Sequence, residues 1–352
     1  MSTENTIESG DAPEAPVIDP AVTSVDDCCV QPTHIGGQAL LEGIMMRGKY
    51  NWAVAVREPS GDIYTEEHDL VSAKDKHAWL RWPIIRGIWG FYETMVLAVK
   101  AFSISAEHSG ESEEEQLDSK EITFAMFGGL ALAIGLFIVL PAVVTNLLVG
   151  SSVDRPFVWN AVDGVMRLVA FFLYIWAVSR MREIHRVFQY HGAEHKTIHA
   201  YERRLPLVPD VIQKYTTLHV RCGTSFLLMV MVVAIVVFSL VPGKAILAAW
   251  GVDGKMWVLL FNIGIRLLLL PLIAGLAYEI TVKWAGSRPE NPLVKVLLWP
   301  GLQMQRMTTA EPDDSMVEVA VAAMSLVVAR EEAEAAARGG AVGTPAPLPE
   351  FD

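Results

Sequence analysis

Cysteine is scarce in this chain of 352 residues, which contains only three. Cys28 and Cys29 lie in a stretch rich in Pro and Asp, and Cys222 stands alone beside an apolar run. Small secreted domains that depend on disulfides carry several spaced cysteine pairs, so this sequence implies no disulfide framework. The first thirty residues also lack a basic start followed by an apolar run, and we expect no cleavable signal peptide.

Charge is almost absent from four apolar stretches that we expect to span the membrane: 122–150, 160–180, 224–242 and 257–283. The first and third contain no charged residue and are each about long enough to cross ~30 Å of hydrocarbon. The other two carry Arg167, Arg266 and Glu279 inside or near them. Arg266 lies deep in its run and needs an anionic partner inside the bundle. We therefore expect a mainly α membrane protein with a four-helix membrane domain at 122–310.

Basic residues are concentrated in the connection between the second and third predicted spans. This connection has eight: Arg180, Arg182, Arg186, Lys196, Arg203, Arg204, Lys214 and Arg221. The other two connections together have three: Arg155, Lys244 and Lys255. Because cytoplasmic loops are enriched in Lys and Arg, we expect the loop 181–223 and both termini to be cytoplasmic in a multi-pass inner-membrane protein.

The net charge of −12 comes largely from the ends of the chain and from an acidic run at 111–121. We expect disordered tails at 1–32 and 339–352, where Pro, Gly and Ala leave little to bury. Residues 108–121 have the composition of a solvated acidic linker. This charge pattern gives no indication of nucleic-acid binding, and we expect none.

A small cytoplasmic region with β structure is predicted at 33–82. Trp52, Val54 and Val56 alternate with smaller or polar residues, and the turn 59–62 follows them, which is the signature of a β-hairpin. The segment Thr33 to Gly48 precedes it, with paired glycines and few charges. The predicted fold is thus mainly α with a small N-terminal α+β or β-hairpin region.

Two amphipathic helices are predicted outside the spans. Residues 83–107 form a largely apolar helix crossed by a line of charges every seven residues: Arg86, Glu93, Lys100 and Glu107. Burying such charges in lipid costs on the order of 2.5–3.5 kcal/mol each, so we expect this helix to lie on the cytoplasmic surface of the bilayer. Residues 311–338 form a second helix, which is too short in its apolar part to cross.

The apolar positions of that second helix are Val317, Val321, Met324 and Val328. Their spacing predicts a docking or self-pairing helix. The expected partners are the lipid bilayer, a membrane or cytoplasmic protein bound through the N-terminal region and this helix, and a second copy of the chain.

A stripe of ionisable side chains is the strongest sign of chemistry. If 189–202 is one helix, positions three and four apart share a face: His191, Glu194, His195, Ile198, His199 and Glu202. The first three form H-x-x-E-H, in which two imidazoles chelate zinc and the carboxylate acts on a water. Gly192 within the stripe suggests a close approach by another backbone or a ligand. The alternative is an amphipathic surface helix with its polar side in water.

A catalytic zinc needs about three protein ligands, and His191 and His195 supply two. The candidates for the third are Glu279, His219 with Cys222, and His199. His199 is rotated about 80° from His191 over two turns, which is too far for all three to meet one ion. We favour Glu279 narrowly, because H-x-x-E-H peptidases take a downstream carboxylate. Its alternative role is a residue at the interface, paired with Lys283.

Three further polar residues are candidates to orient the ligands: Glu42, Arg47 and Glu202. Such outer partners fix the position of a ligating imidazole. Glu42 and Arg47 are few charges among apolar residues, so an ion pair between these two is an equal alternative.

Several of these motifs together resemble the YqhQ-like family, integral membrane proteins of unknown function that are often described as predicted metal-dependent enzymes. The motifs are GGQALLEGIMMRG, RGIWGFYETM, QYHGAEHKTIH, HVRCGTSFLL and AYEI, and the similarity runs from Thr33 to Met307. The family pattern has Pro at Val220 and Met at Leu41, and neither change affects a candidate ligand. The resemblance implies membrane location and metal dependence, but no substrate or reaction.

The function expected from these observations is a membrane-embedded metal-dependent enzyme, a hydrolase at the cytoplasmic face. A divalent metal, zinc first, would bind His191 and His195, and Glu194 would be the general base. The alternative is a non-catalytic membrane scaffold in which the His stripe is structural. A transporter is a weaker third hypothesis, because four spans with few internal charges offer little pathway.

Overall fold

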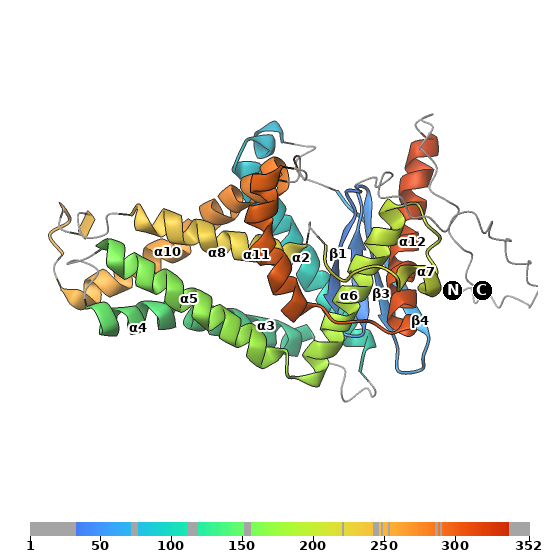
Figure 1. Ribbon diagram of the computed structural model, residues 1–352, viewed down its shortest axis with the longest axis horizontal. Helices are drawn as coiled ribbons and strands as arrows, with labels where there is room; N and C mark the ends of the chain where they lie inside the picture. The colour runs from blue at the N-terminus through green and yellow to red at the C-terminus, as the bar shows by residue number, and fades with distance from the viewer. Residues whose placement is uncertain are drawn as a thin grey trace, which may run out of the picture.

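The computed structural model describes residues 33–337, except for 72–76, 111–118, 151–155, 220–221, 242–245, 248, 253, 286–287 and 289–290. The two predicted tails and most of the acidic linker lie outside these described residues, as do Cys28 and Cys29. The molecule has two parts along its longest axis (Figure 1). Long helices form one end, and a sheet with its covering helices forms the other.

A four-stranded antiparallel sheet forms the centre of the second part. Its strands follow one another in space as in sequence: β1 (Gly36–Leu40), β2 (Gly43–Arg47), β3 (Asn51–Arg57) and β4 (Ile63–Asp69). The pairing of β3 with β4 places Trp52 opposite His68 and Val56 opposite Tyr64. The predicted hairpin is therefore confirmed. The glycine-rich segment before it forms a second hairpin, β1 with β2.

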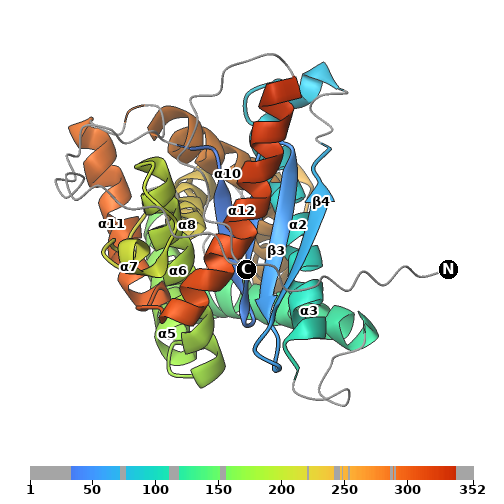
Figure 2. The same cartoon turned by 90° about the vertical axis from the view of Figure 1, so that its right-hand side faces the viewer.

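The two faces of the sheet are covered by different helices (Figure 2). Alternating side chains on β2 and β3 point to opposite faces, as the two-residue repeat of a strand requires. Ile44, Met46, Ala53 and Ala55 join one core with α6 (Arg182–Glu202) and α12 (Asp314–Ala337). On the other face, Met45, Trp52, Val54 and Val56 pack with Leu97 and Ala101 of α2 (Ile85–His108).

The C-terminal helix α12 docks within its own chain. Val317, Val321, Met324 and Val328 are fully buried in the core that α12 shares with the sheet and α6. This contact accounts for the apolar spacing that predicted a docking or self-pairing helix. The apolar face of α12 thus packs on the sheet and α6 of its own chain, and the binding of a partner stays a prediction.

Helix α2 connects the sheet to the long helices. Its second half covers the sheet, and near its start a Cβ added at Gly87 would meet the backbone oxygen of Gly275 in α10 at 2.9 Å. Two of the predicted line of charges have partners: Arg86 binds Glu279, and Glu93 lies 3.5 Å from Arg47. Its location on a bilayer surface stays a prediction.

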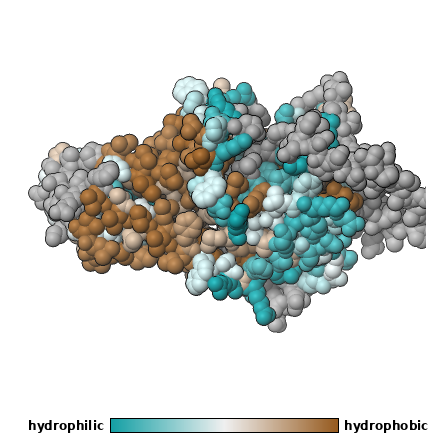
Figure 3. Space-filling view, in the orientation of Figure 1, coloured by the Kyte–Doolittle hydropathy of each residue, from teal (hydrophilic) through white to brown (hydrophobic). Residues whose placement is uncertain are grey.

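The long helices form the other end of the molecule, and the space-filling view shows that end as mostly apolar surface (Figure 3). Their bounds are α3 (Ser119–Ile134), η4 (Gly135–Val139), α4 (Leu140–Val149), α5 (Pro156–Val178), α8 (Gly223–Ser239), α10 (Lys255–Tyr278) and η5 (Glu279–Ala285).

Among the described residues, three helical runs are long and apolar enough to cross a membrane: Phe127–Val149, Val158–Val178 and Met256–Ala285. These runs indicate a membrane protein. The third predicted span, 224–242, corresponds to α8, which has 17 residues and is shorter. Four spans are therefore not confirmed. Arg266 has the anionic partner predicted for it, because its guanidinium lies 2.9 Å from the carboxylate of Asp163.

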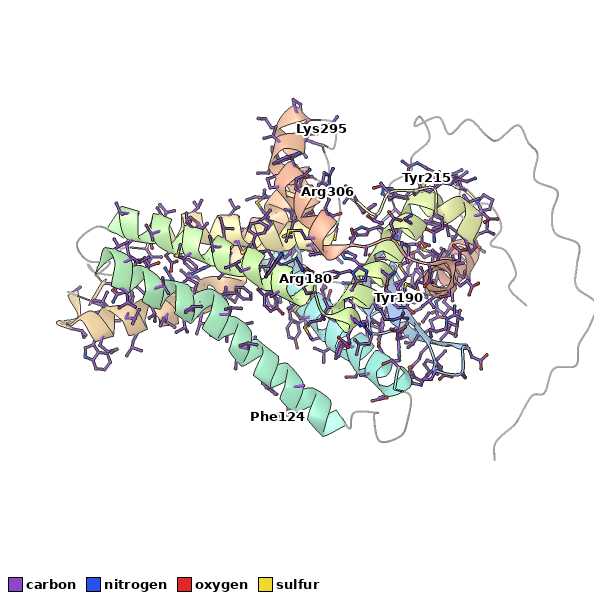
Figure 4. The ribbon with its side chains drawn as sticks, turned by 60° about the horizontal axis from the view of Figure 1, so that its bottom comes forward. Phe124, Arg180, Tyr190, Tyr215, Lys295 and Arg306 are labelled. Carbon is purple, nitrogen blue, oxygen red and sulfur yellow. The ribbon has the colours of Figure 1, made fainter. Side chains whose placement is uncertain are left out.

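One helix within 122–310 was not predicted as a separate element. Helix α11 (Pro292–Thr308) packs on α8, where a Cβ added at Gly301 would meet the Ser225 hydroxyl at 2.7 Å. Figure 4 shows α11 projecting from the bundle at Lys295 and returning to it at Arg306. Its C-terminal end reaches the helix that carries the His stripe. The short elements η3 (Ala78–Arg81) and α7 (Pro209–Ile212) complete the described fold.

Candidate metal centre

The His stripe lies on α6, as predicted, but the second half of the helix, which carries the stripe, is largely buried. Only 5% of Glu194, 1% of His195 and 5% of Glu202 is exposed. Figure 4 shows α6 beside the sheet, with Tyr190 on it and Arg180 at the end of α5 just before it. The alternative interpretation, an amphipathic surface helix with its polar side in water, is therefore wrong. Polar groups buried to this extent require specific partners, since an unsatisfied buried group is costly.

The connection from α11 to α12 passes directly over Gly192. A Cβ built on this glycine would lie 2.1 Å from the backbone oxygen of Ala310, so no larger residue fits. The Ala310 amide also donates to the oxygen of Phe188 at 2.9 Å. The close approach predicted from Gly192 is thus made by a backbone, and it brings the end of α11 onto the His stripe.

Three metal-ligating side chains meet at this point. The ligand atoms of His191, His195 and Cys222 all lie within 4.8 Å of one another. His191 Nε2 is 3.2 Å from Cys222 Sγ, and the two imidazole centroids are 4.4 Å apart. Cys222 is the N-cap of α8, so two segments far apart in sequence form the group. Of the predicted third ligands, Cys222 is the one found beside both histidines.

Backbone carbonyls fix the tautomer of both imidazoles. His191 Nδ1 is 2.8 Å from the oxygen of Thr308, and His195 Nδ1 is 2.5 Å from the oxygen of Thr217. A carbonyl oxygen can only accept, so each Nδ1 carries a proton and, in the neutral ring, each Nε2 has a free lone pair. Ligating histidines in metal sites are held in this way by an acceptor at the second nitrogen.

The protonation states also suit metal binding. Burial lowers the pKa of His195 and favours the neutral ring. Burial by itself would raise the pKa of the Cys222 thiol, but hydrogen bonds with His195 and Thr224 lower it on balance. A thiol at a helix N-terminus is stabilised as thiolate, which is the form that binds metal.

The spacing of the group fits a zinc ion. Bonds of about 2.0–2.1 Å to nitrogen and 2.3 Å to sulfur, at a tetrahedral angle, place N and S about 3.5 Å apart. His191 Nε2 and Cys222 Sγ are separated by 3.2 Å, so small side-chain shifts would admit the ion. Two imidazoles and a thiolate are ligands that zinc prefers, and they leave a fourth position for water or substrate.

Glu194 lies next to this group but is held by the sheet. Its Oε1 accepts from the Gly37 amide of β1 at 3.0 Å, and a Cβ at Gly37 would meet its Cδ at 2.9 Å. Burial raises the pKa of Glu194 to about 7, while His191 lowers it and Cys222 raises it. The carboxyl group therefore changes charge near neutral pH, as a general acid or base must.

This raised pKa predicts a pH-dependent stability. The Glu194 carboxyl ionises near pH 4.5 in the unfolded chain and near pH 7 in the folded one, so folding stability falls as pH rises between these values and stays lower above them. We expect Glu194→Gln to raise the free energy of unfolding by about 3 kcal/mol above neutral pH, and to leave it unchanged at roughly pH 4. Chemical denaturation of the metal-free chain at both ends of this window checks it. The prediction would be contradicted if the free energy of unfolding of wild type and Glu194→Gln differed by the same amount at both pH values.

A second group adjoins the first but is less suited to a metal. The ligand atoms of His199, Glu202 and His219 also lie within 4.8 Å of one another. However, His199 Nε2 is 2.8 Å from the oxygen of Leu218, and its Nδ1 is 3.3 Å from the guanidinium of Arg203. Both ring nitrogens are therefore engaged, and a positive charge lies beside them.

The other two members of this second group hold the protein together. Glu202 Oε1 accepts from the Thr33 amide at 2.9 Å, and its Oε2 lies 3.6 Å from His219 Nε2. Burial, with the nearby charge of Arg203, lowers the pKa of His219 to about 4. The imidazole is consequently neutral at physiological pH. We assign this group a supporting role beside the first.

Glu279, the favoured third ligand, is placed elsewhere. Its carboxylate binds Arg86 through two atoms and accepts from the Ile84 amide at 3.1 Å, and it belongs to neither group of potential ligands. The structure therefore places Glu279 with Arg86, a basic residue of α2, and not with His191 and His195.

Glu42 and Arg47 do not pair with each other. Glu42 binds Arg186 and lies 3.3 Å from the Tyr190 hydroxyl, so it ties the β1–β2 turn to α6. Arg47 contacts Glu93 and Thr94 on α2. Glu42 therefore positions α6, the helix that carries the site, whereas Arg47 holds α2. Within the described part of the chain, neither residue belongs to the group of His191, His195 and Cys222.

Sequence reasoning missed two residues that act through their backbones and one that acts through its side-chain amide. Thr217 and Thr308 hold the imidazoles by carbonyl oxygens, for which no side-chain pattern exists. The amide of Gln305 clamps the main chain of His219 from both sides, at 2.8 and 2.7 Å. Gln305 lies on α11 together with Lys295, Gln303 and Arg306, so its position in the sequence did not distinguish it.

Comparison with known proteins gives a family and no activity. Residues 82–330 match the family described as protein of unknown function (DUF1385). The chain is 32% identical over 313 residues to the uncharacterized protein YqhQ of Bacillus subtilis (strain 168), covering 82% of this chain and 91% of that protein. No solved structure matches it. The resemblance in the sequence motifs is thereby confirmed, and the chain belongs to the YqhQ-like DUF1385 family of proteins of unknown function.

Proposed function

We propose that this chain is a membrane-bound, metal-dependent hydrolase with zinc at His191, His195 and Cys222. The observation that carries the proposal is the orientation of the two imidazoles, whose Nδ1 atoms are both bound to carbonyls while His191 Nε2 faces the Cys222 thiol. When bound, zinc supplies Lewis acidity and eases the deprotonation of a water. Three protein ligands and an open position are typical of catalytic zinc sites.

Glu194 is the general base in this proposal. It is close enough to His191 and Cys222 for their charges to change its pKa, which lies at about 7. A base with this pKa accepts a proton from water and returns it to a leaving group near neutral pH. The Gly37 amide holds one oxygen of the carboxylate and leaves the other to act. Partly exposed His191 marks the side from which a substrate would reach the site.

We place the site at the cytoplasmic face of the inner membrane. The segment between the second and third apolar helices carries eight Lys and Arg, and the described ends of the chain, β1 and α12, lie at the same end of the molecule as α6 (Figure 1). The positive-inside rule favours the cytoplasm for that end. This topology needs α8 as a fourth, short span, and flanking residues or a thinner bilayer can accommodate a short helix.

An exogenous ligand for the metal distinguishes a catalytic from a structural site. We expect the full chain in detergent, loaded with Co²⁺ in place of zinc, to change its visible absorption spectrum when acetohydroxamate is added, because the open position accepts the compound. Glu194→Gln should bind Co²⁺ as the wild type does, since Glu194 is not a ligand.

Two other outcomes of the Co²⁺ experiment would contradict the proposal in different ways. A Co²⁺ spectrum that acetohydroxamate does not alter would indicate a closed site and contradict the hydrolase. The low exposure of His195 and Cys222 would then support the alternative of a non-catalytic scaffold, in which the metal fixes α6 to the start of α8. Failure to bind Co²⁺ at all would contradict the metal centre itself.

A further inference from the structure

Three charged side chains meet inside the helices that have membrane-spanning length. Asp163 and Arg167 lie on α5, and Arg266 lies on α10. Both carboxylate oxygens of Asp163 contact Arg266 at 2.9 Å, and one of them accepts from Arg167 at 3.2 Å. Exposure is 3% for Asp163, 6% for Arg167 and 2% for Arg266. One carboxylate is thus shared by two enclosed guanidinium groups.

The cluster has an excess of one positive charge. The run Phe127–Val149 and helix α8 contain no charged residue. Glu279, the other acidic residue of the three long runs, is engaged by Arg86. No acid within these described helices is therefore left to neutralise the second arginine. An unneutralised charge enclosed among apolar, membrane-length helices is costly and is typical of a functional site.

Hydrogen-bond donors in the same cluster also lack acceptors. Arg167 Nε and Trp159 Nε1 are buried without a partner in the described chain. The Arg266 guanidinium lies over the Trp159 ring at 5.0 Å, and both guanidiniums lie about 5 Å from the Phe238 ring, at 5.2 Å for Arg167 and 5.1 Å for Arg266. The aromatic faces offset part of the charge. These faces do not provide an acceptor in the donor plane for the N–H group of Arg167 Nε or of Trp159 Nε1.

We propose that this cluster of Trp159, Asp163, Arg167 and Arg266 binds an oxyanion, a phosphate or carboxylate group. An anionic oxygen would supply the missing negative charge and accept from the unpaired donors, and guanidinium is the side chain best matched to such groups. The Arg167 side chain keeps 7% of its surface exposed, so the anion meets this residue first. Arg167 Nε is enclosed, and the guanidinium therefore reorients when the anion binds.

Thermal unfolding of the full chain in an uncharged detergent tests this site. The probes are inorganic phosphate, against chloride at equal ionic strength, and phosphatidylglycerol, against phosphatidylcholine. A ligand that binds only the folded chain raises its unfolding temperature, by about 3 °C or more at a hundredfold excess over Kd. A response to phosphate identifies a soluble anion, and a response to phosphatidylglycerol alone identifies a lipid headgroup. Either response supports the site only if it depends on Arg167.

Variants of the cluster test whether the shift in unfolding temperature depends on Arg167. Arg167→Gln leaves the neutral pair of Asp163 and Arg266 and should abolish the shift. Trp159→Phe keeps the ring over Arg266, removes one donor and should reduce the shift. Arg180→Gln, at the end of α5 and outside the cluster, should respond as the wild type does. No shift with either probe in the wild type, or an equal shift in Arg167→Gln, would overturn the proposal.

Discussion

Substitution of His191 or His195 by Ala should reduce the bound metal from about one ion per chain to background. Each imidazole offers only its Nε2 to the ion, because its Nδ1 is held by a carbonyl. Loss of one of three protein ligands leaves two, which is below the number found in zinc sites. Elemental analysis of the full chain purified in detergent measures the ratio directly.

Two histidines on the same helix provide matched controls. His185 is exposed, so His185→Ala should keep the metal. His199→Ala should also keep it, because both nitrogens of His199 are engaged by Leu218 and Arg203. Equal metal content in wild type, His191→Ala and His195→Ala would refute the site. Loss of metal in His199→Ala alone would move the site to the second group.

Gly192→Ala should destabilise the chain by about 3 kcal/mol and weaken metal binding with it. The added Cβ would lie 2.1 Å from the Ala310 oxygen, which is a backbone atom that no rotamer change can move. The connection to α12 must then leave α6, and with it goes the end of α11, including the Thr308 oxygen that holds His191. Denaturation and metal titration of the same preparation measure both effects.

Gly128→Ala is the control for this substitution. Gly128 also lies in a helix, but a Cβ there would meet nothing within 4 Å. Replacing such a glycine by alanine stabilises a helix by about 1 kcal/mol. The two substitutions should therefore change the free energy of unfolding in opposite directions. A Gly192→Ala chain as stable as Gly128→Ala would show that the connection over α6 is not held in place.

Local patterns predicted much of the fold. The alternation around Trp52 to Val56 identified the β3–β4 hairpin, and the three- and four-residue spacing of His191 to Glu202 identified α6. Both signals depend on neighbours in sequence, which share one strand or one helix face. The burial of α6 was not predictable in the same way, because its covers come from distant segments: β1, α12 and the connection after α11.

The third ligand shows where sequence reasoning fails. Glu279 was favoured for its order along the chain, but Arg86 was interpreted separately, as part of a line of charges on a helix at the bilayer surface. Two charges that satisfy each other cannot be recognised as partners while their helices are unplaced. Cys222 was a candidate from the start, and only the packing of α8 against the end of α11 selects it. The carbonyls that orient the imidazoles leave no trace in the sequence.

X-ray absorption at the zinc edge of the full, zinc-loaded chain tests the metal centre most directly. The account predicts one sulfur ligand at about 2.3 Å and two imidazole nitrogens at about 2.0–2.1 Å, with one further light atom in the open position. The sulfur signal should disappear in Cys222→Ser, and it should remain in Glu279→Gln. A first shell of nitrogen and oxygen alone in the wild-type chain would contradict the assignment of His191, His195 and Cys222 as the metal centre.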